Sequence, residues 1–440
     1  MPKLAHEGYP AINSFVRGSG APCVYCIPFR GRCAVSDNRL SFADGVAPEY
    51  IANPYPLYQE LRAQDPVLWD ERAGSWVLTG YAGVVAALRD PRFSVTGFME
   101  NTSWIPEEML ETLGPAVRAI TRQMLFLDPP DHTRLRGLVA KAFTPRVVDA
   151  TRPRIQQVAG ELLDAVQANG RMNVVLDFAY PLPAIVIAEM LGVPPGDRNQ
   201  FLTWSRQFGA LLGGANLTHE SVFQALAGVS EFIEYFRQII RRRRTDPKDD
   251  LMQAMINAEE QGGVLSEEEL LGNCVLLLSA GHGTTTHLIG NGTLALLQHP
   301  DQLQQLRDDP ALISPAVVEL LRYDSPVQLT SRRAKGDLEI GGKHISSGQE
   351  VLICLGGANR DPAQFAEPDR LDLHRRENRH LSFGQGIHFC LGAPLARVEA
   401  EIAFSTLLDR FQALYLDSEI LEWQLSQVFR GLKELPVRFA

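Results

Sequence analysis

The sequence predicts a single, mainly α-helical domain with minor β-sheets. The 440-residue chain is 45% apolar and 21% charged, which allows a large core and argues against disorder. Short β-like runs occur near Val67–Trp69 and Ser75–Thr79, and they return between Val327 and Ile345. Between these runs, helical periodicity dominates, broken by turn signals such as Asp128–Pro130 and Val193–Pro195. Helices therefore account for most of the domain.

The first regular element is an amphipathic helix at Tyr55–Arg62. Residues 1–45 are rich in Gly, Pro and Ser and are expected to form an irregular extension, which leaves 46–440 as the folded domain. Cys23 and Cys26 in this extension have a spacing that could hold a metal or be redox-active. Because no second Cys-x-x-Cys follows, an irregular segment is the preferred interpretation.

Composition and charge argue against several classes of binding partner and cellular location. A net charge of −10 without a large basic block argues against nucleic acid. No apolar run is long enough to cross a bilayer, and Leu270–Ile289 is interrupted by polar residues, so it is expected to be a core helix. The six scattered cysteines do not form a disulfide framework, and the N-terminus lacks a secretory pattern. We therefore expect a cytoplasmic protein without a membrane anchor.

One predicted helix crosses the whole domain. Ser266–Glu269 forms a capping box and the next stop signal is at His299, about 50 Å away at the α-helical rise. Its middle, Ala280–Thr284, contains two glycines, each of which costs about 1 kcal/mol relative to alanine. Either Gly281 lets a planar ligand approach the backbone beside the Thr284 hydroxyl, or small residues pack against a neighbouring helix. Both interpretations remain open at this stage.

A glycine-rich loop, residues 383–392, carries Cys390 just before another amphipathic stretch. Cysteine pKa falls at helix N-termini and beside metals, and sulfur is a soft donor that suits iron. A lone cysteine lacks the partner ligands of a structural zinc or iron–sulfur site, so haem is the preferred ligand. His388 is too close in sequence to bind the opposite face of the same iron, and we expect it to hydrogen-bond a haem carboxylate. The alternative is an inert, buried cysteine.

This loop resembles the haem-binding loop of the cytochrome P450 family, whose pattern is F-x-x-G-x-x-x-C-x-G. Every fixed position is filled, by Phe383, Gly386, Cys390 and Gly392. The resemblance covers about residues 46–440. It implies the cytochrome P450 fold, a single large domain around a buried haem b, with Cys390 as the proximal iron ligand.

The long central helix resembles the family motif A-G-x-[DE]-T through Ala280, Gly281 and Thr284. The resemblance implies that these residues, with Gly283, lie over the distal face of the haem and that Thr284 is the distal hydroxyl. Gly283 departs from the family, which usually has a proton-relaying acid there. Protons would then travel through waters, the two threonine hydroxyls at 284 and 285, or His282. Alternatively, the chemistry depends less on that relay and uses peroxide as oxidant.

Further motifs of the family follow in the expected order. Glu319 and Arg322 resemble its E-x-x-R helix, although such a pair alone is commonly a surface ion pair. Arg370 resembles the arginine that completes a Glu-Arg-Arg cluster. The resemblance also implies donors to the haem propionates, which suit arginine pairing, and the predicted donors are His132, Arg136, Arg332 and His388.

The resemblance implies a monooxygenase that inserts one oxygen atom from O₂ into C–H or C=C of a lipophilic small molecule. The alternatives are a peroxide-driven peroxygenase and a non-catalytic haem sensor. Family topology predicts a mostly apolar pocket, lined by residues Phe98–Ile105, Phe208–Leu217, Leu277, Ala280, Val327–Leu329 and the region near Val428.

Electrons are expected from a separate ferredoxin and ferredoxin reductase, because the chain has no reductase domain. The locally basic segment His374–His380, with Arg134 and Lys141, could form a docking patch for an acidic partner. A solvated loop is the alternative. A monomer is expected.

Overall fold

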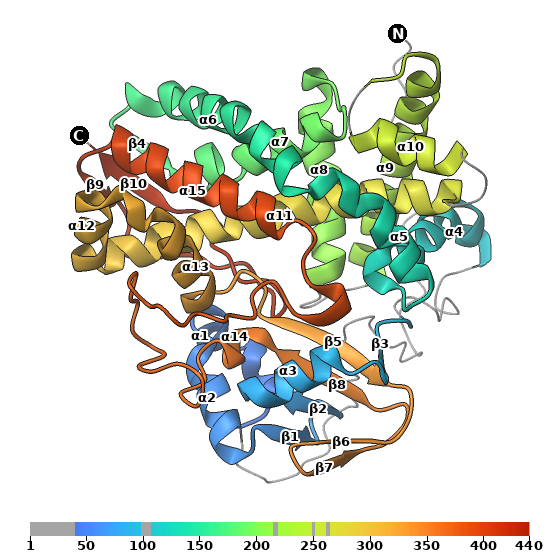
Figure 1. Cartoon of the computed structure of the whole chain (residues 1–440), viewed down its shortest axis with the longest axis horizontal. Helices are drawn as coiled ribbons and strands as arrows, with labels where there is room; N and C mark the ends of the chain where they lie inside the picture. The colour runs from blue at the N-terminus through green and yellow to red at the C-terminus, as the bar shows by residue number, and fades with distance from the viewer. Residues whose placement is uncertain (1–39, 98–106, 214–218, 249–250, 261–264, 440) are drawn as a thin grey trace.

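The computed structural model describes residues 40–97, 107–213, 219–248, 251–260 and 265–439 (Figure 1). Its α-helices are α1 (Pro48–Ala52), α2 (Tyr55–Gln64), α3 (Tyr81–Arg89), α4 (Glu107–Thr121), α5 (Asp131–Val139), α6 (Pro145–Gln167), α7 (Pro181–Met190), α8 (Arg198–Gly213), α9 (His219–Thr245), α10 (Leu251–Glu260), α11 (Glu267–Gln298), α12 (Pro300–Asp308), α13 (Ile313–Tyr323), α14 (Leu355–Ala358) and α15 (Ala393–Arg410). Its strands are β1 (Val67–Asp70), β2 (Ser75–Leu78), β3 (Phe93–Ser94), β4 (Arg171–Asn173), β5 (Leu329–Ala334), β6 (Leu338–Ile340), β7 (Lys343–Ile345), β8 (Glu350–Cys354), β9 (Leu414–Leu416) and β10 (Pro436–Phe439).

The main sheet joins the early and late β-like runs of the sequence. Its strand order is β1-β2-β8-β5-β3, and only the β2–β8 pair is parallel. Leu78 pairs with Ile353, so two strands more than 250 residues apart in sequence lie side by side, and Leu329 on β5 pairs with Cys354 on the other edge of β8. Figure 1 shows this sheet with α1, α2 and α3 on one side of the molecule and the larger helical part on the other. The predicted mainly helical fold with minor sheets is confirmed.

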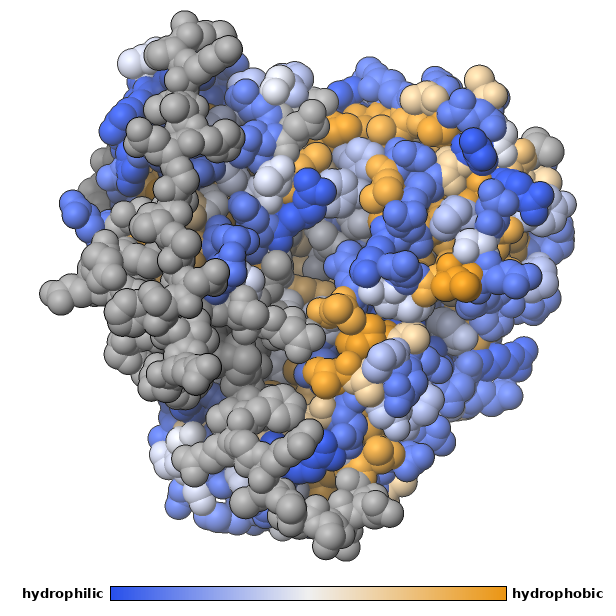
Figure 2. Space-filling view, turned by 180° about the vertical axis from the view of Figure 1, so that it is seen from behind, coloured by the Kyte–Doolittle hydropathy of each residue, from blue (hydrophilic) through white to orange (hydrophobic). Residues whose placement is uncertain are grey.

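Helix α11 runs through the helical part, where it packs against α4, α7, α8, α9 and α15 (Figure 1). The predicted capping box is present in both directions, because Ser266 Oγ accepts from the Glu269 N–H and the Glu269 carboxylate accepts from the Ser266 N–H. The helix ends at Gln298, directly before His299, as predicted. Among the described residues, no helix has the length and apolarity needed to cross a membrane. Figure 2 shows a largely hydrophilic face with separate apolar patches.

The packed domain reaches back a few residues further than the predicted boundary at residue 46. A short 3₁₀ helix, η1 (Phe42–Val46), is capped by Ser41, and Phe42 is only 1% exposed. The buried Asp70 carboxylate at the end of β1 accepts hydrogen bonds from the Ser41 hydroxyl (2.8 Å) and the Phe42 N–H (2.6 Å). A buried carboxylate requires such donors, so these hydrogen bonds hold residues 41 and 42 against β1. The predictions for Cys23 and Cys26 lie outside the described residues.

Candidate active site

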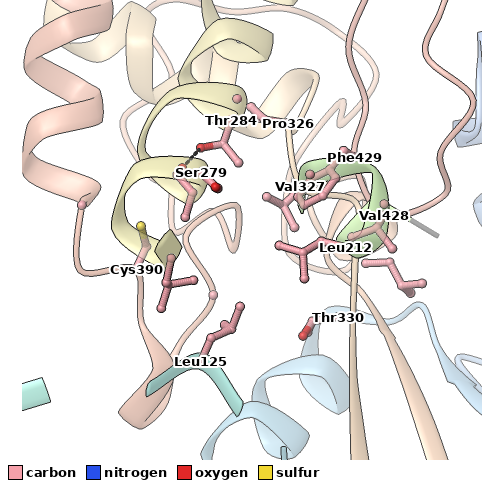
Figure 3. Close-up of a pocket in the computed structure, with 18 of the residues that line it drawn as sticks. Leu125, Leu212, Ser279, Thr284, Pro326, Val327, Thr330, Cys390, Val428 and Phe429 are labelled. Atoms are coloured by element: carbon pink, nitrogen blue, oxygen red, sulfur yellow. Dashed lines mark hydrogen bonds between the residues drawn. The ribbon is translucent and has the colours of Figure 1, made fainter. Parts of the chain in front are cut away.

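A cavity of about 1370 Å³ lies between the middle of α11 and the loop that carries Cys390. Figure 3 shows Cys390 entering it from the loop before α15, and Ser279 and Thr284 entering from α11. Leu125, Val327 and Val428 contribute apolar surface. Most of the lining is apolar, as predicted, with Leu277, Ala280, Val327, Leu329 and Val428 among the lining residues. The predicted contribution of Phe98–Ile105 falls on residues outside the described ranges.

The cysteine loop is shaped by backbone contacts that require glycine. Gly386 has φ of +73°, and a Cβ there would collide with the carbonyl oxygen of Leu88. The Cys390 N–H donates to the Phe383 carbonyl (2.8 Å), and the Phe383 ring lies under the Arg397 guanidinium at 5.3 Å. Gly392 is different, because its φ of −81° is ordinary and a Cβ there would meet no protein atom within 4 Å. That glycine leaves room on the cavity side, where a flat ligand can approach the backbone.

Cys390 is half-buried, and desolvation of its thiol by the surrounding protein raises the pKa of that thiol. The N–H groups of Gly392 and Ala393, together with Arg136 and Arg397, oppose this effect. The start of α15 therefore stabilises the thiolate form of Cys390, as expected. In the protein without haem, desolvation of the charged sulfur has the larger effect. A cation in the cavity would have to displace the thiol proton, as is usual for metal binding by cysteine.

Two buried histidines meet beside the cysteine loop. The rings of His132, on α5, and His388 lie 4.2 Å apart, and His132 Nδ1 and His388 Nε2 are buried without a hydrogen-bond partner among the described residues. Arg136 donates to the Phe389 carbonyl (2.6 Å), and Arg332 on β5 donates to the Ser331 carbonyl (2.7 Å).

All four predicted propionate donors thus line one cavity. Burial lowers the pKa of His132, and burial with the neighbouring cationic groups lowers that of His388 to about 3, so both rings are neutral. Unpaired ring nitrogens beside guanidinium groups suit an anionic partner, since buried polar atoms are normally hydrogen-bonded. The donor set therefore fits the carboxylates of haem.

On α11, the structure supports the packing interpretation of the small residues. A Cβ on Gly281 would lie 3.1 Å from Ile187 of α7, so this glycine permits close helix packing, and its backbone also lines the cavity. Ala280 is exposed to the cavity, and the Thr284 hydroxyl donates to its carbonyl (3.0 Å). A Cβ on Gly283 would meet no atom within 4 Å. An acidic side chain would fit there, but the chain does not provide one.

Sequence reasoning missed an acid that lines the same cavity. Glu399 on α15 is 1% exposed, and neither of its carboxyl oxygens has a hydrogen-bond partner among the described residues. Burial raises its pKa to about 8, against a smaller opposing effect of the Thr285 hydroxyl on α11. The signal was available, because Glu399 shares a helical face with the buried Leu395 and Ile402 and thus occupies an apolar position.

A buried ionic cluster joins α13 to the segment that precedes the cysteine loop. Glu319 and Arg322 on α13 form a bidentate pair at 2.8 Å, with side chains 1% and 0% exposed. Arg375 completes the cluster at 3.2 Å from Glu319, and Asn378 donates to the same carboxylate at 2.8 Å. The predicted E-x-x-R pair is therefore a buried structural pair and not a surface one.

The prediction for Arg370 is wrong. Its side chain is 61% exposed and pairs with Glu367, and only its carbonyl takes part in the cluster, by accepting from Arg322 (3.1 Å). The chain turns at residues 367–370, so the Arg370 side chain points outward and Arg375, five residues later, reaches Glu319. The third member of the Glu-Arg-Arg cluster is Arg375.

This correction predicts unequal effects of two arginine substitutions. Arg375→Ala removes a partner of a buried carboxylate and should lower the free energy of unfolding by about 3 kcal/mol. Arg370→Ala removes an exposed pair and should change it by less than about 1 kcal/mol. Denaturant unfolding of the two variants measures both values. Equal losses would contradict the assignment of Arg375 to the cluster.

The predicted docking patch is smaller than expected. Within His374–His380, Arg375 is committed to Glu319, and His380 has its pKa lowered to about 3 by burial and by Arg397. Arg134 pairs with Glu269 (2.5 Å) and Asp131. Of the basic residues in this segment, only His374, Arg376 and Arg379 are exposed, beside the exposed acid Glu377, and the Lys141 side chain is not among those described. The patch is therefore a short exposed stretch.

Comparison with known proteins agrees with this geometry. Residues 112–427 match the family model described as Cytochrome P450. The chain is 43% identical to cytochrome P450 CYP107DY1 of Priestia megaterium, over 91% of this chain and 100% of that protein. It is 41% identical to the 6-deoxyerythronolide B hydroxylase of Saccharopolyspora erythraea, over 87% and 95% of the two chains.

A solved structure is also similar. The crystal structure of P450BioI in complex with acyl carrier protein ligated to hexadec-9Z-enoic acid superposes with a TM-score of 0.83 at 40% identity, covering 89% of this chain and 100% of that one. The match thus extends from the sequence motifs to the arrangement of the whole domain. This chain belongs to the cytochrome P450 family of oxidoreductases and binds haem b.

Proposed function

We propose that this enzyme inserts one oxygen atom from O₂ into a lipophilic small molecule by hydroxylation or epoxidation. The observation that carries the proposal is one cavity that holds the Cys390 thiol, the Thr284 hydroxyl and a mostly apolar lining. The names of two relatives, a 6-deoxyerythronolide B hydroxylase and a complex with a hexadecenoyl carrier protein, support lipophilic substrates.

Each group in the cavity has a distinct part in this proposal. Haem b, when bound, supplies oxygen activation, and a thiolate ligand favours O–O cleavage. Cys390 supplies the thiolate, and His132, Arg136, Arg332 and His388 hold the haem carboxylates and so orient the ring. The apolar lining excludes water from the substrate side. The protein thus contributes binding, orientation and electrostatics to chemistry that the cofactor performs.

Proton supply in this proposal rests on hydroxyl and carboxyl groups of the chain. The Thr284 hydroxyl carries a proton on the side of α11 that faces the cavity. In the structure this hydroxyl donates a hydrogen bond to the Ala280 carbonyl. The Glu399 carboxyl is protonated at neutral pH, because its pKa is raised to about 8. It lies beside Thr285, and we infer that it replaces the acid absent at Gly283. Neutral, buried His282 packs against Tyr180 and has no part in this route.

The electron source is also proposed. A separate ferredoxin and ferredoxin reductase would dock on the side of the cysteine loop, near the exposed His374, Arg376 and Arg379. We further propose a cytoplasmic monomer. If docking depends on these charges, raising the ionic strength should slow electron transfer.

A second candidate is a peroxide-driven peroxygenase, which the glycine at position 283 favours. Product formation from a substrate that shifts the haem spin state should be compared with two oxidant systems: hydrogen peroxide alone, and NAD(P)H with ferredoxin and reductase. We expect turnover with the second system. Turnover with peroxide alone would support the peroxygenase, and turnover with neither would contradict both.

A further inference from the structure

Arg206 presents a cation to the substrate cavity from a face of α8. Arg206, Gly209 and Gly213 all line the cavity, and their spacing of three and four residues places them on one helical face. The Arg206 side chain is exposed to this space. A Cβ on Gly209 would meet no atom within 4 Å, so open volume lies beside the arginine on the same face.

The Tyr180 ring contacts this arginine, and the same ring packs against His282 of α11. The Arg206 guanidinium carbon lies 5.8 Å from the centroid of the Tyr180 ring, within cation–π range. The Tyr180 ring meets the His282 ring edge-on at 5.3 Å, and His282 Nδ1 lies 3.2 Å from the hydroxyl of Ser205, the neighbour of Arg206 on α8. Burial lowers the pKa of His282 to about 4, so this ring is neutral and the local charge is that of Arg206.

The other cationic side chains that line the cavity either pair with a carboxylate of the protein or are expected to bind the haem carboxylates. Arg333 pairs with Glu350 at 2.9 Å, and Lys433 pairs with Glu422 at 3.0 Å. The two arginines at 136 and 332 lie with the histidines that suit the haem carboxylates.

Arg206 is different, because in the described part of the chain no carboxylate lies within ion-pair distance of it. The two acids that line the cavity within the described residues do not pair with it, because Glu350 pairs with Arg333 and Glu399 lies beside Thr285. A cavity with one uncompensated cation and mostly apolar walls is complementary to an amphipathic anion.

We propose that Arg206 binds the carboxylate of a lipophilic acid and thereby selects acidic over neutral substrates. This inference rests on the proposed monooxygenase function and names its substrate class. A planar guanidinium pairs with a carboxylate through two parallel hydrogen bonds, and such a pair is stronger in an apolar cavity than in water. The alkyl part of the acid would occupy the apolar lining.

The test uses haem-loaded protein and optical titration of the haem spin state. The probes are straight-chain carboxylic acids of about ten to sixteen carbons and the alcohols of the same lengths, which differ only in the charged group. We expect the protein to bind the acids more tightly than the alcohols. Arg206→Gln should weaken binding of the best acid by about tenfold or more, the usual range for a charge-assisted hydrogen bond, and leave alcohol binding unchanged.

Two further variants make the outcome specific. Arg206→Lys keeps the charge and should restore part of the preference for acids, and Arg370→Gln removes an exposed arginine that does not line the cavity and should leave the binding of acids and alcohols unchanged. Equal weakening of acid and alcohol binding by Arg206→Gln, or no preference for acids in the unaltered protein, would overturn the proposal. Failure of the proposed function is distinguishable, because it would appear in the carbon monoxide spectrum and in turnover of neutral substrates.

Discussion

Replacing Cys390 with alanine is expected to abolish the carbon monoxide spectrum typical of thiolate-ligated ferrous haem and all oxygen insertion. The thiol is a soft donor in a loop whose glycines and Phe383 carbonyl fix its position, and the described residues contain no other cysteine that lines the cavity. Water or a neighbouring histidine could occupy the iron in the variant, but neither supplies sulfur. The measurement is the difference spectrum of the reduced, haem-loaded variant with carbon monoxide.

Cys354→Ala is the matched control. Cys354 is fully buried, but it caps α14, where its sulfur accepts from the Gly357 N–H at 3.3 Å, and it does not line the cavity. The control should lose about 1 kcal/mol of stability and keep the thiolate spectrum. Persistence of that spectrum in Cys390→Ala, or its loss in Cys354→Ala, would show that the iron ligand has been misassigned.

The local parts of the site were predictable from sequence because they depend on neighbours along the chain. The capping box of α11 needs only Ser266 and Glu269, and the cysteine loop needs glycines within a decapeptide. Each motif specifies its own backbone geometry. The structure accordingly confirms the beginning and end of α11 and the helix that follows Cys390.

Features that depend on distant partners were not predictable. The packing role of Gly281 requires Ile187, which is 94 positions earlier in the sequence. The choice of Arg375 over Arg370 depends on the direction of a turn, since both arginines lie in one short segment that is distant from Glu319 in sequence. The two-residue strand β3 exists because Phe93 pairs with Ala334. In each case the deciding contact joins segments that a sequence pattern cannot place side by side.

Substitution of Glu399, the buried acid on α15, is expected to have the other large effect on the reaction. Glu399→Gln keeps the shape of the side chain and removes its exchangeable carboxyl proton, so coupling of NAD(P)H oxidation to product should fall by about tenfold or more, toward the roughly 10²-fold that marks the lower range for loss of general acid catalysis. The physical reason is the position of the Glu399 carboxyl. It lies beside Thr285 of α11, and α11 has no acid at position 283. Product formed per NAD(P)H consumed measures the effect.

Stability against pH checks the protonation state independently of turnover. Because the folded-state pKa of Glu399 is about 8 and the ordinary pKa of a glutamate carboxyl is about 4.5, the folded protein binds one more proton than the unfolded chain between these values. This group therefore makes the free energy of unfolding fall by about 1.4 kcal/mol per pH unit as pH rises through that window. The slope should be shallower in Glu399→Gln protein without haem. An unchanged slope would mean that Glu399 is already ionised in the folded state.

Placing a carboxyl group on α11 tests whether Glu399 acts as a proton donor or only as a packing residue. A side chain at position 283 has open space around its Cβ, so Gly283→Glu should be tolerated. If Glu399 stands in for the missing acid, then Gly283→Glu should restore coupling in the Glu399→Gln background and add less in the unaltered protein, because there one donor is already present. A merely structural defect on α15 would not be repaired from α11. Equal improvement in both backgrounds, or none in the double variant, would therefore show that protons reach Thr284 without Glu399.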